Sequence, residues 1–166
     1  MALEGRTIRE GVIVGGIAYL AVAAFYGVFD LLAARGALFT VDLLGKAVFQ
    51  GLRDPAVLEL PIQPDLGAIV QYNALHLAVS LLIGLIVTGL VDHAERHAAH
   101  ARMVSLIIMS GFIVTVVAVG LLTAPIRALV PWWSIVMANG LAVVLASNYL
   151  VRRHPGIWDR LSPFAG

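Results

Sequence analysis

Four long apolar runs limit what this chain can fold into more than any other feature of its sequence. They cover residues 11–34, 66–91, 103–124 and 129–151. A helix needs about 20 apolar residues to cross the hydrocarbon core of a bilayer, and each run reaches that length. Because backbone polar groups in a bilayer must be satisfied inside the protein, such a run folds as an α-helix. We therefore expect four transmembrane helices.

The overall composition agrees with a membrane protein. Hydrophobic residues make up 60% of the chain and charged residues 13%, whereas charged residues are roughly 25% of a soluble domain. The four spans leave no room for a separate soluble domain. We expect a single all-α domain, residues 1–166, with its four transmembrane helices in an antiparallel bundle. The first span is flanked by acids as well as arginines, unlike a signal peptide, so we expect it to be retained.

Several classes of function are excluded by the residues that are missing. The sequence has no cysteine, which excludes disulfides, thiolate metal sites and a thiol nucleophile. A net charge of +1 offers no basic surface for nucleic acid. The motifs of phosphate-binding loops, serine hydrolases, zinc proteases and dinucleotide sites are also missing. We expect no enzymatic activity.

The positive charges predict an orientation, because lysine and arginine are enriched in cytoplasmic loops. With an even number of spans, both termini and the connection 92–102 share one side. That side carries Arg6, Arg9, Arg96, Arg102, Arg152, Arg153 and Arg160. The other side carries Arg35, Lys46, Arg53 and Arg127. The bias predicts a multi-pass protein of a bacterial inner (cytoplasmic) membrane with both termini in the cytoplasm.

The connection between the first two spans contains a predicted amphipathic helix over residues 41–52. Its apolar residues at helical spacing are Val41, Leu44, Val48, Phe49 and Leu52. Thr40 can cap the start, and Asp42 falls in the first turn, where the helix dipole favours an anion. We expect this short helix to lie in the membrane interface.

Small residues four apart predict where helices pack, because they let two backbones approach closely. They are Gly11 and Gly15 in the first span, Gly84 and Thr88 in the second, Gly111 and Thr115 in the third, and Ala138, Ala142 and Ala146 in the fourth. Such pairs fit packing within the bundle or against the helices of partner subunits.

A polar face on the second span supplies the candidate cofactor-binding residues. They are Tyr72, Asn73 and His76, with Asn139 of the fourth span at a similar depth. An ionisable residue inside a membrane is a candidate for function, and imidazole can bind haem iron or donate to a quinone. The alternative is a structural hydrogen bond from His76 to Asn139, to Thr115 or to a backbone carbonyl. Asp30 of the first span could pair with Arg35 or reach the outer end of this polar face.

The stretch VDHAERHAAHAR, residues 91–102, supplies the candidate metal ligands. They are His93, His97 and His100. No glycine or proline interrupts this stretch, so we expect the second helix to continue through it and to carry the three histidines on one face. Histidines four apart on a helix suit a zinc ion. The alternative is a solvated helical extension in which Asp92 pairs with Arg96.

The segment from Gly45 through the second span resembles a loose pattern in small bacterial four-span membrane proteins of unknown function. The pattern is an amphipathic segment followed by Tyr-x-x-x-His at the start of a glycine-containing span. It rests here on Tyr72, His76, Gly84 and Gly89. The resemblance implies no activity, but it supports treating Tyr72 and His76 as one packed unit.

Together these observations predict a non-catalytic accessory subunit of a larger bacterial membrane complex, of the energy-converting (respiratory or photosynthetic) kind. Its partners would be other transmembrane subunits and lipids, and it would carry no cofactor of its own. Two alternatives stay open. One is a redox subunit that binds haem or quinone through His76, and the other is a small oligomeric transporter or channel.

Overall fold

The chain is all-helical in the computed structural model, which describes residues 5–54 and 63–156. The elements in chain order are α1 (Gly5–Leu32), α2 (Phe39–Phe49), α3 (Leu66–Arg96), the short turn η2 (Ala98–His100), α4 (Ala101–Leu122), the short turn η3 (Ala124–Ile126) and α5 (Trp132–Arg153). The four long helices are long and apolar enough to cross a membrane. The predicted all-α fold with four candidate spans is therefore confirmed.

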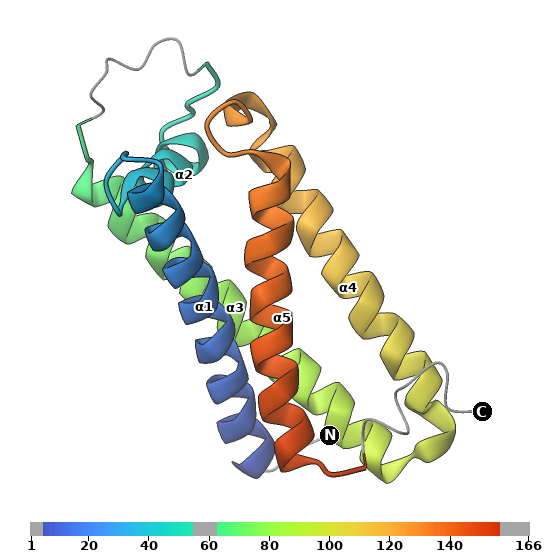
Figure 1. Ribbon diagram of the computed structural model, residues 1–166. Helices are drawn as coiled ribbons and strands as arrows, with labels where there is room; N and C mark the ends of the chain where they lie inside the picture. The colour runs from blue at the N-terminus through green and yellow to red at the C-terminus, as the bar shows by residue number, and fades with distance from the viewer. Residues whose placement is uncertain (1–4, 55–62, 157–166) are drawn as a thin grey trace.

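The long helices form a bundle in which the start of α1 and the end of α5 lie at the same end (Figure 1). We call this end, where α1 starts and α5 finishes, the terminal end. The opposite end, where α2 lies, is the α2 end. α1 packs along α3 more extensively than any other two elements do, and it also contacts α5. This arrangement is compatible with the predicted antiparallel bundle.

Close contact between α1 and α3 depends on the glycines that the sequence singled out. Gly11 and Gly15 of α1 lie directly on the backbone of α3, next to Gly84. A Cβ atom at Gly15 would stand 2.6 Å from the Cα of Leu81, closer than two carbon atoms can approach. These positions must therefore stay free of side chains, and the predicted packing role of this glycine pair is confirmed.

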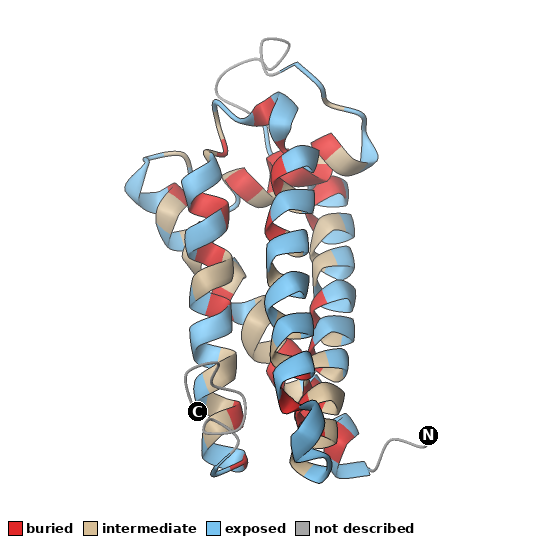
Figure 2. Ribbon diagram, turned by 90° about the vertical axis from the view of Figure 1, so that its right-hand side faces the viewer, coloured by how far each residue is buried: buried red, intermediate tan, exposed pale blue. Residues whose placement is uncertain are grey.

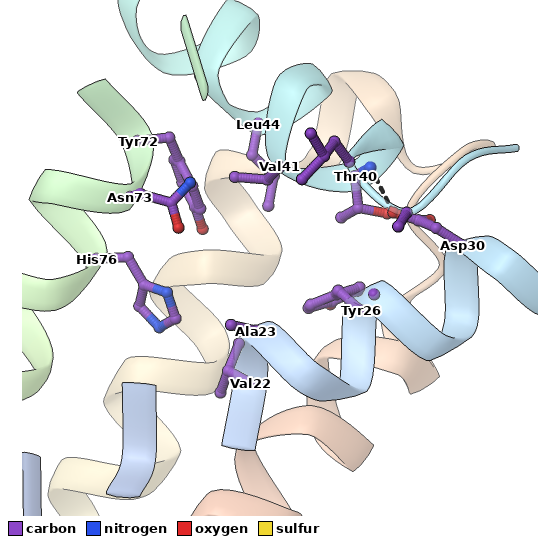
Figure 3. A pocket seen from close by; sticks show the side chains of 13 residues that line it. Val22, Ala23, Tyr26, Asp30, Thr40, Val41, Leu44, Tyr72, Asn73 and His76 are labelled. Atoms are coloured by element: carbon purple, nitrogen blue, oxygen red, sulfur yellow. Dashed lines mark hydrogen bonds between the residues drawn. The ribbon is translucent and has the colours of Figure 1, made fainter. Parts of the chain in front are cut away.

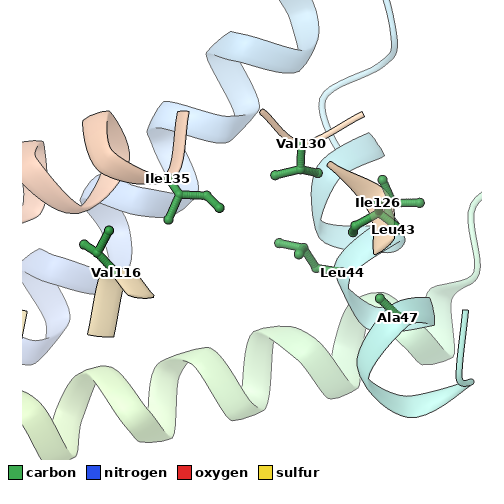
Figure 4. Packing of buried hydrophobic residues seen from close by; sticks show 7 residues of the cluster. All are labelled: Leu43, Leu44, Ala47, Val116, Ile126, Val130 and Ile135. Atoms are coloured by element: carbon green, nitrogen blue, oxygen red, sulfur yellow. The ribbon is translucent and has the colours of Figure 1, made fainter. Parts of the chain in front are cut away.

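α2 differs from its prediction in both its start and its buried face. It begins at Phe39, and its N-cap residue Leu38 makes no side-chain hydrogen bond, so the predicted cap by Thr40 is wrong. The buried side is formed by Leu43, Leu44 and Ala47, whereas Phe49 is exposed. The reason is that α2 packs on α3 and contributes to an apolar cluster with residues of α4, η3 and α5 (Figure 4).

The start of α3 is fixed by charged groups at its junction with α2. Asp65 Oδ1 accepts from the Ala68 amide at 3.1 Å and caps the helix, while Gln50 donates to Oδ2 at 2.6 Å. The hydrogen bond from Gln50, followed by that from the Ala68 amide, holds the pKa of Asp65 below its usual value. Asp42 accepts from the Asp65 amide at 2.8 Å and pairs with Lys46 at 2.6 Å. The beginning of α3 is therefore tied to α2.

α4 is attached much less tightly than the other long helices. It contacts α3 and α5 only sparsely, and much of its surface is exposed (Figure 2). Near its start, Val104 packs against residues of α3 and α5. Near its end, Gly120 lies so close to the ring of Trp132 that a Cβ would collide with it. Between these points Gly111 has open space where a side chain would stand, so no other helix in the described ranges packs against this small residue.

Candidate functional site

A pocket at the α2 end brings together most of the polar residues that the sequence selected. Its volume is about 100 Å³, and it lies between α1, α2 and α3. Figure 3 shows Tyr72, Asn73 and His76 pointing from α3 toward α1 and α2, with Tyr26 of α1 facing them. The three α3 residues share this side because His76 lies four positions after Tyr72 and three after Asn73, spacings that fall on one face of a helix. The predicted grouping of Tyr72, Asn73 and His76 is therefore present.

Two close helix contacts give this pocket its walls. The glycines of α1 bring that helix against α3, and Gly45 brings α2 onto α3 because it lies against the carbonyl group of Ala68. The space left between the three helices is open on one side, where Ala23 of α1 and Leu38 before α2 are exposed. The pocket therefore opens onto the apolar surface of the bundle.

Asn73 has both of its polar atoms occupied by the protein. The Tyr19 hydroxyl donates to its Oδ1 at 2.9 Å, and its Nδ2 donates to the Ile69 carbonyl at 2.9 Å. Tyr26 is likewise engaged, because its hydroxyl lies 3.4 Å from Ser134 Oγ of α5. These two residues therefore serve to hold α1 against α3 and α5.

His76 contacts two aromatic rings. Its centroid lies 5.2 Å from that of Tyr19 and 6.0 Å from that of Tyr72, with the rings tilted. Among the residues that the structure describes, neither the His76 imidazole nor the Tyr72 hydroxyl has a hydrogen-bond partner. The predicted packing of Tyr72 and His76 as one unit is present, and both keep their polar atoms available.

Asn139 does not belong to this group. Its Nδ2 donates to the Ile135 carbonyl of its own helix at 2.8 Å, and the residue does not line the pocket. Thr115 similarly donates to the carbonyl of Gly111 at 2.8 Å. The predicted bond from His76 to either residue is therefore wrong. The physical reason is that polar side chains in apolar helices can satisfy themselves on the preceding turn of backbone.

Sequence reasoning missed two tyrosines of α1, Tyr26, which lines the pocket, and Tyr19, which contacts His76 and Asn73 beside it. They are seven apart on α1 and thus share one face of that helix. This spacing was the available signal, but it is hard to separate from that of an ordinary aromatic face.

The histidine stretch is arranged differently from the prediction. α3 ends at Arg96, and His97 has φ −132° and ψ 78°, so the helix does not run through to α4. The three rings nevertheless stack, with 4.5 Å between the centroids of His93 and His97, and His93 Nε2 lies 3.0 Å from His100 Nδ1. Over residues 5–54 and 63–156, no three His, Cys, Asp or Glu side chains are placed to hold one metal ion. A metal site there gains no support from the geometry and stays a prediction. The predicted pair of Asp92 with Arg96 is present.

A buried carboxylate fastens the α2 end. Asp30 is fully buried and accepts from both the amide and the hydroxyl of Thr40, each at 2.7 Å. Arg35 lies 3.3 Å from the same carboxylate, as predicted, and donates to the Leu129 carbonyl at 2.9 Å. One carboxylate thus joins the end of α1, the start of α2 and the segment before α5.

A second cluster of polar side chains, which was not predicted, joins helices at the terminal end. His154, which follows α5, is 3% exposed. Its Nε2 lies 2.9 Å from the carboxylate of Glu10 in α1. Its Nδ1 lies 2.8 Å from the carboxylate of Glu95 in α3, but this second contact is not aligned as a hydrogen bond. Arg6 pairs with Glu10 at 3.0 Å. Residues so far apart in sequence gave no local pattern from which to infer this contact.

Comparison with known proteins adds no relative to this description. No family model matches the chain, and no curated protein and no solved structure matches it.

Proposed function

We propose that the protein is a non-catalytic, structural subunit of a larger membrane complex, which binds partner transmembrane helices through α4. The observation that carries this proposal is the unused packing surface of α4. Gly111 and Ala118 of this helix are exposed, whereas Gly11, Gly15, Gly84 and Ala138 are buried. Small residues at an open helix face permit the close approach of another helix.

The charged groups of the bundle support a structural role. Asp30 is held by Thr40 and Arg35, and Glu10 is held by Arg6 and His154. An ion carrier needs charged groups along a path through the membrane that can release their partners. Here the buried carboxylates are used to join helices, which disfavours the transporter or channel alternative.

The redox alternative is favoured in one respect, because His76 faces a pocket. A haem needs more room than the pocket's volume of about 100 Å³. A bis-histidine haem also needs a second imidazole, and within the described part of the chain no other histidine lines the pocket. A quinone contact fits this space better than a haem does.

The proposal includes the host suggested by the sequence, a bacterial inner membrane with both termini in the cytoplasm and an energy-converting complex as the assembly. The positive charges of the terminal segments support that orientation.

Extraction from native membranes in a mild detergent tests the proposal. We expect the protein to co-purify with other transmembrane polypeptides in fixed proportion, and Gly111→Leu to lose them while keeping its own helical fold. Recovery of a homo-oligomer without other polypeptides would contradict the proposal and favour a channel. A haem absorption band that disappears in His76→Ala would instead establish the redox alternative.

A further inference from the structure

The polar groups that line the pocket fall into two sets. Asn73, Tyr26 and Asp30 are all engaged by other residues of the protein. The Tyr72 hydroxyl and the His76 imidazole have no such partner in the described ranges. The pocket therefore presents a phenol and an imidazole, both from the same face of α3.

An unpaired polar group in apolar surroundings is unfavourable, and nearly all such groups in proteins find a hydrogen-bond partner. A phenol can donate to an oxygen, and a neutral imidazole can donate from one nitrogen and accept at the other. The complementary ligand carries a carbonyl or hydroxyl oxygen that reaches both side chains.

The shape of the pocket narrows the class of ligand further. Its volume of about 100 Å³ is smaller than the cavity of about 150 Å³ that binds benzene, so it can take at most one six-membered ring, and part of that ring would lie in the opening. The rings of Tyr26 and Tyr72 form part of the lining, and aromatic walls favour a flat ring by stacked or edge contacts.

The opening shows how such a molecule would enter. Ala23 and Leu38, at the open side, are exposed residues of a surface that is apolar over most of α1. A ring that bears an apolar tail can be inserted with its tail leaving between α1 and the start of α2.

From these features we infer that the pocket binds the head group of a lipid-soluble benzoquinone, in its oxidised or reduced form. Tyr72 donates to a ring oxygen, His76 hydrogen-bonds the same or the second oxygen, and the tail extends into the lipid. The inference concerns binding alone and includes no electron transfer. It does not depend on the proposed contact between α4 and partner helices, which lies elsewhere in the bundle.

Photolabelling of the purified full chain with a short-tailed azido-benzoquinone tests this inference. We expect saturable labelling within α1 or α3 that decyl-benzoquinone displaces and decanol does not. Tyr72→Phe and His76→Leu should each weaken binding about tenfold, the effect of one hydrogen bond. Tyr149→Phe is the matched control, because it removes a phenol that does not line the pocket and should leave binding unchanged.

The inference is overturned by labelling that does not saturate, or by decanol that competes as well as the quinone. Equal weakening by Tyr149→Phe would also contradict it. Circular dichroism and gel filtration identify variants that have lost the bundle. Wild-type affinity in either folded pocket variant, Tyr72→Phe or His76→Leu, would count against the assigned hydrogen bonds.

Discussion

The α1–α3 pair and α4 are both built from apolar residues with small residues between them, yet they pack in opposite ways. Gly15 and Gly84 are buried where two backbones meet, whereas Gly111 stands open to the surroundings. Side-chain hydrogen bonds at both ends of the bundle join α1 to neighbouring elements. In the described residues, the side-chain hydrogen bonds of α4 stay within that helix and its last turn and reach no other long helix. The difference separates a closely packed pair of helices from a helix whose small residue Gly111 stays exposed.

Adding a side chain at equivalent small residues gives the largest contrast. Gly15→Leu should prevent the bundle from forming, because the leucine would occupy the position of the α3 backbone. Gly111→Leu should leave the isolated chain's stability unchanged within about 0.5 kcal/mol. Unfolding in mixed detergent micelles, followed by circular dichroism, measures both. A folded Gly15→Leu protein would mean that α1 and α3 do not pack as described.

Removing the buried carboxylate at the α2 end should have the next largest effect. Asp30→Ala leaves Thr40 and Arg35 without their acceptor, and we expect a loss of about 3 kcal/mol. This loss is near the lower end of the range for breaking a buried ion pair, because the Arg35 side chain is 22% exposed. Asp92→Ala breaks a pair at the bundle surface and should cost about 0.5 kcal/mol or less. Equal losses in the two variants, measured by the same unfolding assay, would contradict the burial of Asp30.

Two asparagines distinguish a bond between helices from a bond within one helix. Asn73→Leu removes the bond with Tyr19 of α1 and should cost about 0.6 kcal/mol, the average for a bond between membrane helices, and at most about 1.7 kcal/mol. Asn139→Leu removes only a bond to its own backbone and should cost less. Comparing the variant that carries both Tyr19→Phe and Asn73→Leu with the two single variants gives the coupling energy between these side chains. A coupling of zero would show that these two side chains do not interact.

The smallest effect is expected from acid at the start of α3. Asp65 has a pKa below the ordinary value of 3.8. A carboxylate of this kind stabilises the folded protein above that value, and the contribution is lost as the pH falls through the lowered pKa. The midpoint of thermal unfolding should therefore differ between the wild type and Asp65→Asn at pH 7 and converge in stronger acid. A difference that stays constant with pH would exclude a role for this charge.

The spans could be predicted from the sequence because the length and apolarity of a membrane helix are local properties. The packing of Gly11 and Gly15 was also accessible, since it follows from spacing within one helix. The end of α3 at Arg96 could not be predicted in this way, because no glycine or proline stands there. The residues around the turn at His97 are not of a kind that marks the end of a helix.

The candidate site was only partly predictable for a related reason. Tyr72, Asn73 and His76 lie on one turn of α3, so helical spacing alone places them together. Tyr19 enters from another helix, and His154 reaches Glu10 across almost the whole length of the chain. Asn139 was misplaced because similar depth in the membrane does not fix which way a helix faces.

The proposed function requires that α4 is the helix through which the protein contacts its partners. Two single-site variants with a photoreactive benzoylphenylalanine test it, one at Val114 of α4 and one at Leu20 of α1, which are 65% and 64% exposed. In native membranes we expect Val114 to crosslink to another polypeptide and Leu20 to label lipid. Crosslinking at Leu20 but not at Val114, or only between copies of this chain, would contradict the claim.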